Sequence, residues 1–168
     1  MRYKILGLIA AVALVAACET ASEGGGAQTG GGATSATTSA GAIRPGSQED
    51  LVVNVGDRVF FDFDKFNLKP DARKTLEKQA AWLKANPSVR VTVEGHCDER
   101  GTREYNLALG ERRANSAKDF LVANGIAANR VRVISYGKER PVALGHDEAS
   151  WAQNRRAVSV ITSGAAGS

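Results

Sequence analysis

The chain has 168 residues, of which 43% are hydrophobic and 6% are aromatic, enough for one modest domain. Its 22 Lys and Arg against 18 Asp and Glu give a net charge of +4. This excess is small, and two Arg-Arg pairs at positions 112–113 and 155–156 are too few to track a nucleic-acid backbone. The composition therefore argues against a nucleic-acid-binding function.

The first 17 residues are typical of a secretory signal peptide (1–17). Arg2 and Lys4 precede a nearly unbroken apolar stretch over residues 5–15, which is too short for a comfortable membrane span. The sequence Leu-Val-Ala-Ala-Cys at 14–18 resembles the lipobox of bacterial lipoproteins, in which the cysteine, here Cys18, becomes the lipidated first residue. The alternative is an ordinary signal peptide with an incidental Cys18. Removal of the leader would leave a net charge of +2.

A segment with almost nothing to bury follows the leader. Residues 19–48 are mainly Gly, Ala, Ser and Thr and include two Gly-Gly-Gly runs. This composition is typical of a flexible linker. We therefore expect residues 18–50 to be a tether between the lipidated cysteine and a domain over residues 51–168.

The first half of that domain predicts one strand and one helix. After an apolar segment at 51–55, aromatic and β-branched residues predict a strand at 59–63, with Asp62 at its carboxyl end. Pro70 suits the first turn of a helix whose apolar face runs to Leu83, and Asn86-Pro87 ends it.

The second half predicts three strands and a long helix. Val91 and Val93 alternate with polar residues in a strand at 89–94, which we expect Gly95 to end where the chain must turn. A helix at 105–124 follows, with Gly125 just beyond its end. Strands are expected at 131–136 and 157–161, and a helical turn at 147–154. Two helices and about four strands predict an α/β (α+β) two-layer sandwich, with helices on one face of a mixed sheet.

The helix at 105–124 carries two adjacent rows of residues. One row is apolar and predicts a face packed on the core: Leu107, Gly110, Ala114, Ala117 and Leu121. Asn106, Leu109 and Arg113 form the other row, while Asp98 lies in the loop before the helix. Asp98 and Arg113 could thus line one pocket, either as a structural ion pair or as a site where a carboxylate binds an ammonium and a guanidinium grips a carboxylate.

Other chemistry is poorly supported. The row of potential ligands at 96–99 cannot converge on one metal ion, so we expect no metal site. Cys97 beside His96 suggests a thiol and base, but side chains of adjacent residues point apart in an extended segment. With Cys18 acylated, Cys97 has no disulfide partner within the chain and is open to oxidation, pairing between chains or shielding. A wall hydrolase that uses Cys97 remains the rival interpretation.

Several motifs occur together in a fixed order. They are EGHCDERGT at 94–102, YN at 105–106, LGERRAN at 109–115, SYGKERP at 135–141 and NRRAV at 154–158. In this order they resemble the peptidoglycan-associated lipoproteins, whose domain is shared with the C-terminal part of outer-membrane protein A. The resemblance covers residues 59–161, and the lipobox and tether match the lipoprotein branch.

The resemblance implies a non-enzymatic protein without a cofactor that binds the stem peptide of peptidoglycan. The ligand group is meso-diaminopimelate, whose side-chain end carries a free ammonium and a carboxylate. By motif position the family's ligand residues fall on Asp98 and Arg113, Asn106 and Leu109 match supporting positions, and Asp62 matches the acid of the strand-end motif. The NRR signature at 154–156 is expected to give structural support. Cys97 stands where relatives usually hold Ala or Thr.

The resemblance also implies a place in the cell envelope. Family members are anchored by acyl chains in the outer membrane, with the domain in the periplasm, and act in the Tol-Pal system in envelope integrity and cell division. TolB is the implied partner and competes for an overlapping surface. A stator or porin that shares this domain is disfavoured, because the sequence offers neither a second membrane span nor barrel strands.

Overall fold

The computed structural model describes residues 43–164, so the predicted signal peptide, Cys18 and most of the predicted tether lie outside the described residues. The elements in chain order are α1 (Gln48–Asp50), η1 (Leu51–Val55), β1 (Arg58–Phe60), α2 (Pro70–Ala85), β2 (Arg90–His96), α3 (Arg103–Ala123), η2 (Ala128–Arg130), β3 (Val131–Gly137), α4 (Glu148–Asn154) and β4 (Arg156–Ser163). Within this part of the chain, no helix is both long enough and apolar enough to cross a membrane.

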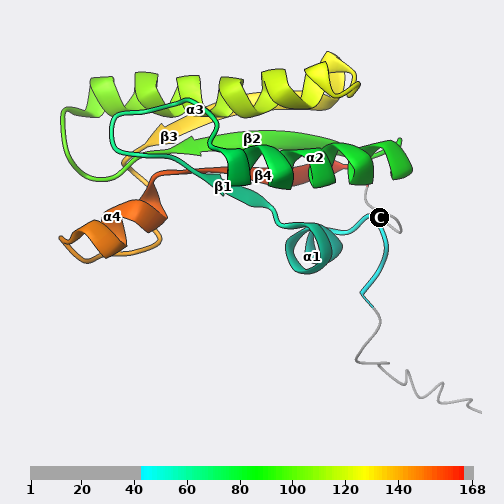
Figure 1. Ribbon diagram of the computed structural model, residues 1–168, viewed down its shortest axis with the longest axis horizontal. Helices are drawn as coiled ribbons and strands as arrows, with labels where there is room; N and C mark the ends of the chain where they lie inside the picture. Colours follow the sequence, from blue (N-terminus) through cyan, green and yellow to red (C-terminus); the bar gives the residue numbers. More distant parts are fainter. Residues whose placement is uncertain (1–42, 165–168) are drawn as a thin grey trace, which may run out of the picture. The chain divides into compact units, whose positions relative to one another are not determined.

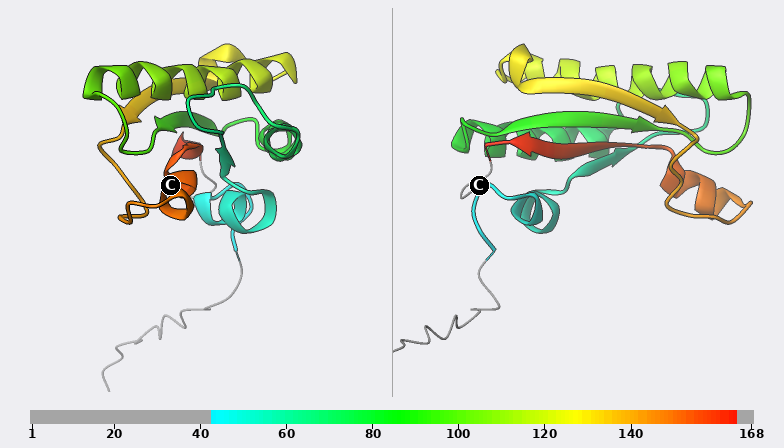
Figure 2. Two further views of the ribbon diagram at one scale, coloured as in Figure 1. Left: turned by 60° about the vertical axis from the view of Figure 1, so that its left-hand side comes forward. Right: turned by 180° about the vertical axis from the view of Figure 1, so that it is seen from behind.

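The four strands form one mixed sheet in the order β1-β4-β2-β3. β4 is antiparallel to both of its neighbours, and β2 runs parallel to β3. The long helices α2 and α3 cover the same face of the sheet (Figure 1), and the view from behind in Figure 2 shows β3, β2 and β4 in front of them. The predicted α/β two-layer sandwich is confirmed.

The hydrophobic core lies between this face of the sheet and the two long helices. Its buried residues are Val59, Phe61, Ala72, Leu76, Ala80, Leu83, Val89, Val91, Val93, Ala114, Ala117, Leu121, Ile126, Val131 and Ala157. The period-2 and period-3.6 patterns in the sequence correspond to these positions, because a strand buries every second residue and a helix buries one stripe.

Gly125 follows α3 with φ +89°, and its N–H donates to the carbonyl of Val122. It ends the helix as predicted.

Two predictions about β1 and β2 were wrong. β1 ends at Phe60 and not at residue 63, because its partner β4 begins at Arg156, opposite Phe60. Gly95 does not turn the chain but lies inside β2 beneath α3. A Cβ atom at Gly95 would be only 1.8 Å from the carbonyl oxygen of Gly110, so glycine here permits close packing of strand and helix.

The N-terminal end of the described chain is fastened to the sheet by side chains. The Gln48 amide accepts from the Ile161 N–H at 2.8 Å and donates to the Ser159 carbonyl at 3.3 Å, and so takes the place of a strand residue beside β4. The Asp50 carboxylate accepts from Trp82 Nε1 of α2 at 2.9 Å. The folded structure therefore includes residues on the N-terminal side of the boundary expected at 51.

Candidate functional site

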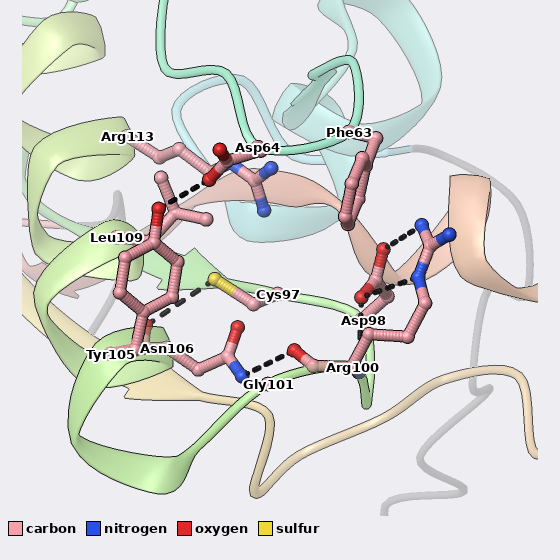
Figure 3. A pocket seen from close by; sticks show the side chains of 10 residues that line it. All are labelled: Phe63, Asp64, Cys97, Asp98, Arg100, Gly101, Tyr105, Asn106, Leu109 and Arg113. Carbon is pink, nitrogen blue, oxygen red and sulfur yellow. Dashed lines mark hydrogen bonds and ion pairs between the residues drawn. The ribbon is translucent and has the colours of Figure 1, made fainter.

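A cavity of about 180 Å³ opens beside the end of β2 (Figure 3). Three segments line it: the loop after β1, the loop after β2, and the first three turns of α3. Their lining residues are Phe63, Asp64, Cys97, Asp98, Arg100, Gly101, Tyr105, Asn106, Leu109 and Arg113. The structure thus brings together Asp98, Asn106, Leu109 and Arg113, as the sequence predicted, but Asp62 is not among the lining residues.

The loop after β2 is held in place by the helix that follows it. Gly101 has φ +90°, which favours glycine, and Thr102 caps α3 by accepting from the Tyr105 N–H. The Asn106 amide is 2% exposed and donates to the carbonyls of Arg100 at 2.8 Å and Thr102 at 3.0 Å. Asn106 therefore fixes the shape of the loop that carries Asp98.

Arg113 extends from the third turn of α3 and is 0% exposed. Its guanidinium donates to three backbone carbonyls, those of Lys65 at 2.8 Å, His96 at 2.8 Å and Asp62 at 3.1 Å. These bonds use three of the five N–H groups of a guanidinium. Burial lowers the pKa of Arg113 despite nearby Asp98. Among the described residues no carboxylate forms a direct ion pair with Arg113, although Asp98 and Asp64 are near enough to act on its charge, so a buried guanidinium bonded only to carbonyls lies at the cavity wall.

Asp98 is 4% exposed and faces two other arginines. Its carboxylate accepts from Arg100 Nη2 at 2.7 Å and from Arg155 Nη1 at 3.3 Å, and its Oδ1 also accepts from the Arg100 N–H. Burial alone would raise the pKa of Asp98, but these hydrogen bonds outweigh it and hold the pKa below its usual value. Asp98 and Arg113 thus do not form the structural ion pair considered above, yet Asp98 does not stand unpaired either.

Asp62 was expected in the site, and only its backbone reaches it. Its carboxylate is 62% exposed and pairs with Lys69 at 2.8 Å, which lowers the pKa of Asp62. The next acid along the chain, Asp64, lines the cavity and accepts a hydrogen bond from the Tyr105 hydroxyl. Asp62 continues the alternation of β1 and faces solvent after the buried Phe61, whereas Asp64 lies in the turn that follows, with φ +55°.

The NRR motif contacts the site more closely than expected. Arg155 is 6% exposed and joins Asp98 to the segment just after β1, since its Nε donates to the Phe61 carbonyl at 3.0 Å. Its Nη2 also donates to Glu148 at 2.5 Å. Asn154 accepts from the N–H groups of residues 142 and 143 and so holds the loop before α4. Arg155 is therefore a positioning residue for Asp98.

Sequence reasoning missed the aromatic and cationic part of the cavity wall. The Arg100 guanidinium lies between two rings, 3.9 Å from the centroid of Phe63 and 4.1 Å from that of Trp151. Tyr105 stands one turn before Leu109, so helical spacing offered a signal for Tyr105. No local signal links Phe63, Arg100 and Trp151, because they come from three separate segments.

Cys97 lacks the surroundings of a nucleophile. The thiol is 3% exposed and donates to the Asn106 carbonyl at 3.3 Å, and burial raises the pKa of Cys97 to about 11. Burial and nearby Arg156 lower the pKa of His96 to about 4, and neither ring nitrogen has a hydrogen-bond partner among residues 43–164. The thiol is therefore shielded and protonated, which disfavours the hydrolase interpretation. No group of three potential metal ligands converges within residues 43–164.

The model of the OmpA family matches residues 60–155. The peptidoglycan-associated lipoprotein of Rhizobium meliloti is 59% identical over 129 residues, which are 77% of this chain and 72% of that protein. That of Pasteurella multocida is 43% identical over 156 residues, or 92% and 95% of the two chains. The chain belongs to the peptidoglycan-associated lipoproteins of the OmpA family.

Solved structures agree with this membership. The crystal structure of the peptidoglycan-associated lipoprotein from Burkholderia pseudomallei is 42% identical, with a TM-score of 0.63, and covers 67% of this chain and all of that one. The C-terminal domain of Helicobacter pylori MotB is 21% identical with a TM-score of 0.60 over 64% of this chain and 84% of that one, and shares the fold alone.

Proposed function

We propose that this protein is a non-enzymatic outer-membrane lipoprotein that binds peptidoglycan and holds the membrane to the cell wall. The names of its relatives and the OmpA family match support peptidoglycan binding. The alignment with the Pasteurella multocida protein extends over nearly the whole chain, which supports the same layout of leader, tether and domain. Cys18 is the lipidated residue in this proposal, and the domain faces the periplasm.

The observation that best supports the proposed binding site is the position of Arg113. A fully buried guanidinium without a carboxylate partner among the described residues is costly unless it serves a ligand. The cavity at its side is large enough for a small aliphatic group. A ligand carboxylate that reaches Arg113 would supply the missing counterion through charge-assisted hydrogen bonds.

The rest of the cavity suits the side-chain end of meso-diaminopimelate. In our proposal its carboxylate binds Arg113 and its ammonium binds the Asp98 carboxylate, next to Arg100. Phe63 and Leu109 provide apolar contact for the methylene groups, and Asn106 keeps the loop in position. Arg155 also donates to the Asp98 carboxylate. In our proposal it keeps Asp98 ionised and oriented while the ligand ammonium binds the same carboxylate.

We further propose that the protein acts in the Tol-Pal system in envelope integrity and cell division, with TolB as a partner. This part rests on family membership. If TolB covers the cavity, it excludes the stem peptide, and a competition experiment with labelled peptide would detect this.

Titration calorimetry of the unlipidated chain, residues 19–168, with a stem tripeptide that contains meso-diaminopimelate tests the binding site. We expect saturable binding that Asp98→Asn and Arg113→Lys each weaken by about 10-fold to 100-fold, the range for lost hydrogen bonds to charged groups. Asp62→Asn is the matched control, since its carboxylate lies in solvent. Absence of binding by the parent, or equal binding by all four proteins, would contradict the proposal.

A further inference from the structure

A second cavity, of about 140 Å³, lies on the other side of the loop that carries Asp98. The two cavities share Cys97 as a lining residue. Alternate residues of the loop face alternate cavities: Asp98 and Arg100 line the first, whereas Glu99 lines the second. The loop is thus a partition between two neighbouring cavities.

Lys138 contacts this loop from the side of the second cavity. Its ammonium donates to the carbonyl of Gly101 at 2.7 Å and to that of Glu99 at 3.2 Å. Gly101 itself lines the first cavity, so the Lys138 ammonium lies directly behind that cavity's wall. Both hydrogen bonds go to neutral carbonyls, and no carboxylate in the described part of the chain pairs with Lys138.

The acid of the second cavity is already engaged by other groups. The Glu99 carboxylate lies 2.8 Å from His146 Nδ1, and its Oε1 accepts from Trp151 Nε1 at 2.8 Å. Glu99 is therefore directed toward the loop before α4 and toward α4 itself, while Lys138 forms no ion pair within the part of the chain that the structure describes. Pro141 and Leu144 add apolar lining to the cavity.

This set of groups resembles the first cavity in its chemistry. Each cavity has one cation whose partners are backbone carbonyls, beside apolar side chains. A half-buried ammonium keeps one N–H for another acceptor after two carbonyl bonds. An anionic group on a short aliphatic stem would complete the charge, because a charge-assisted hydrogen bond is stronger than a neutral one.

We propose that the second cavity binds a second carboxylate of the same ligand, with Lys138 as its cation. The proposal rests on the proposed peptidoglycan function. A stem tripeptide offers two such groups beyond the side-chain end of meso-diaminopimelate, namely the α-carboxylate of the γ-linked D-glutamyl residue and the C-terminal carboxylate. Recognition of either carboxylate would let the protein distinguish stem peptides with a free carboxylate from amidated ones, in addition to recognising diaminopimelate.

The test is titration calorimetry of the unlipidated chain with three forms of L-alanyl-γ-D-glutamyl-meso-diaminopimelate: unmodified, amidated at the D-glutamyl α-carboxylate, or amidated at the C-terminus. We expect the parent to bind one amidated form on the order of tenfold more weakly than the unmodified peptide. Which form is weakened identifies the carboxylate. Lys138→Met should weaken the unmodified peptide by the same factor and abolish the discrimination.

Lys78→Met is the control for charge, because Lys78 is an exposed residue of α2. It should keep the discrimination of the parent. Equal binding of all three peptides by the parent would overturn the second subsite and leave the proposed function intact. A Lys138→Met variant that weakens all three equally would also overturn it, since this result means loop support alone. No binding of any peptide would overturn the proposed function together with the subsite.

Discussion

The two halves of α3 bury adjacent rows of residues for different purposes. In the C-terminal half the buried residues are Ala114, Ala117 and Leu121, all apolar and all in the core. In the N-terminal half the same side of the helix buries Asn106 and Arg113 together with Leu109. One half stabilises the sheet by hydrophobic contact, whereas the other carries polar groups into the cavity.

The difference shows what a polar site requires of the fold. A buried alanine needs only contact, but a buried guanidinium needs a hydrogen-bond acceptor for each N–H group that has left water. Arg113 obtains these acceptors from the turn after β1 and from the end of β2. The polar half of α3 therefore depends on two other segments, and the apolar half should be separable from ligand binding.

The largest expected effect comes from the apolar half. Leu121→Ala removes a side chain that is 0% exposed, and we expect the free energy of unfolding to fall by about 2–5 kcal/mol. Urea unfolding checks this. Val122→Ala on the same turn is the control, since Val122 is 36% exposed and its truncation should have a much smaller effect. A loss of affinity in folded Leu121→Ala would show that the halves are coupled.

The junction between the halves should be nearly as sensitive. Gly95→Ala places a Cβ against the backbone of Gly110, and we expect a loss of about 1–3 kcal/mol in unfolding free energy. Gly110→Ala is a useful contrast, because its Cβ would meet the Ser135 hydroxyl at 2.3 Å. Ser135→Ala should partly rescue Gly110→Ala and should not rescue Gly95→Ala. If Ser135→Ala rescued Gly95→Ala and Gly110→Ala equally, the proposed clash between a Cβ at position 95 and the backbone of Gly110 would be contradicted.

The polar region should also respond to pH through His96, which is 2% exposed and has a pKa lowered to about 4. The unfolded chain binds a proton at His96 near pH 6.5 and the folded chain does not, so stability falls as the pH drops from about 6.5 to 4. The contribution reaches about 3 kcal/mol at pH 4.

His96→Phe should remove this part of the pH dependence, as urea unfolding at several pH values would show. The ring nitrogens have no hydrogen-bond partners to lose, although Glu94 lies 3.6 Å away. His146 is the control with the opposite sign. Its hydrogen bond to Glu99 raises the pKa of His146, so its stabilisation is present at low pH and lost as the pH rises. Parallel curves for the parent and His96→Phe would be inconsistent with a buried neutral His96.

The smallest effects should distinguish the two acids that follow β1. Asp62→Asn alters an exposed pair with Lys69 and should change stability by less than about 1 kcal/mol, with unchanged affinity for the tripeptide. Asp64→Asn changes a residue that lines the cavity and should weaken binding several-fold. Titration calorimetry of Asp62→Asn and Asp64→Asn with the tripeptide would measure this difference in affinity. The reverse ranking would restore Asp62 to the site.

The sequence predicted most elements of the fold because their patterns are local. The alternation of apolar residues predicted β2, and the 3.6-residue period predicted α3. The loop before this helix and one row of its residues predicted that Asp98 and Arg113 line the same cavity. The Asp62 carboxylate does not line the cavity, because the alternation of β1 continues past its end: Val59 and Phe61 are buried, whereas Asp62 faces solvent.

The partners of Asp98 could not be predicted in the same way. Arg155 lies 57 residues further along the chain, and its distance from Asp98 depends on the strand order. The stacking of Arg100 between Phe63 and Trp151 likewise joins three distant segments. The role of Gly95 was misread because a glycine that turns the chain and one that admits a neighbouring helix look alike in sequence.

The attachment of Gln48 to β4 has a mechanical consequence. In a protein that links two large structures, tension enters where the linking chain joins the domain, here just before α1. The Gln48 amide passes this load to β4 in the middle of the sheet, and Asp50 passes part of it to α2 through Trp82. In the proposed anchor, this route would spare the short edge strand β1, which precedes the loop that lines the cavity.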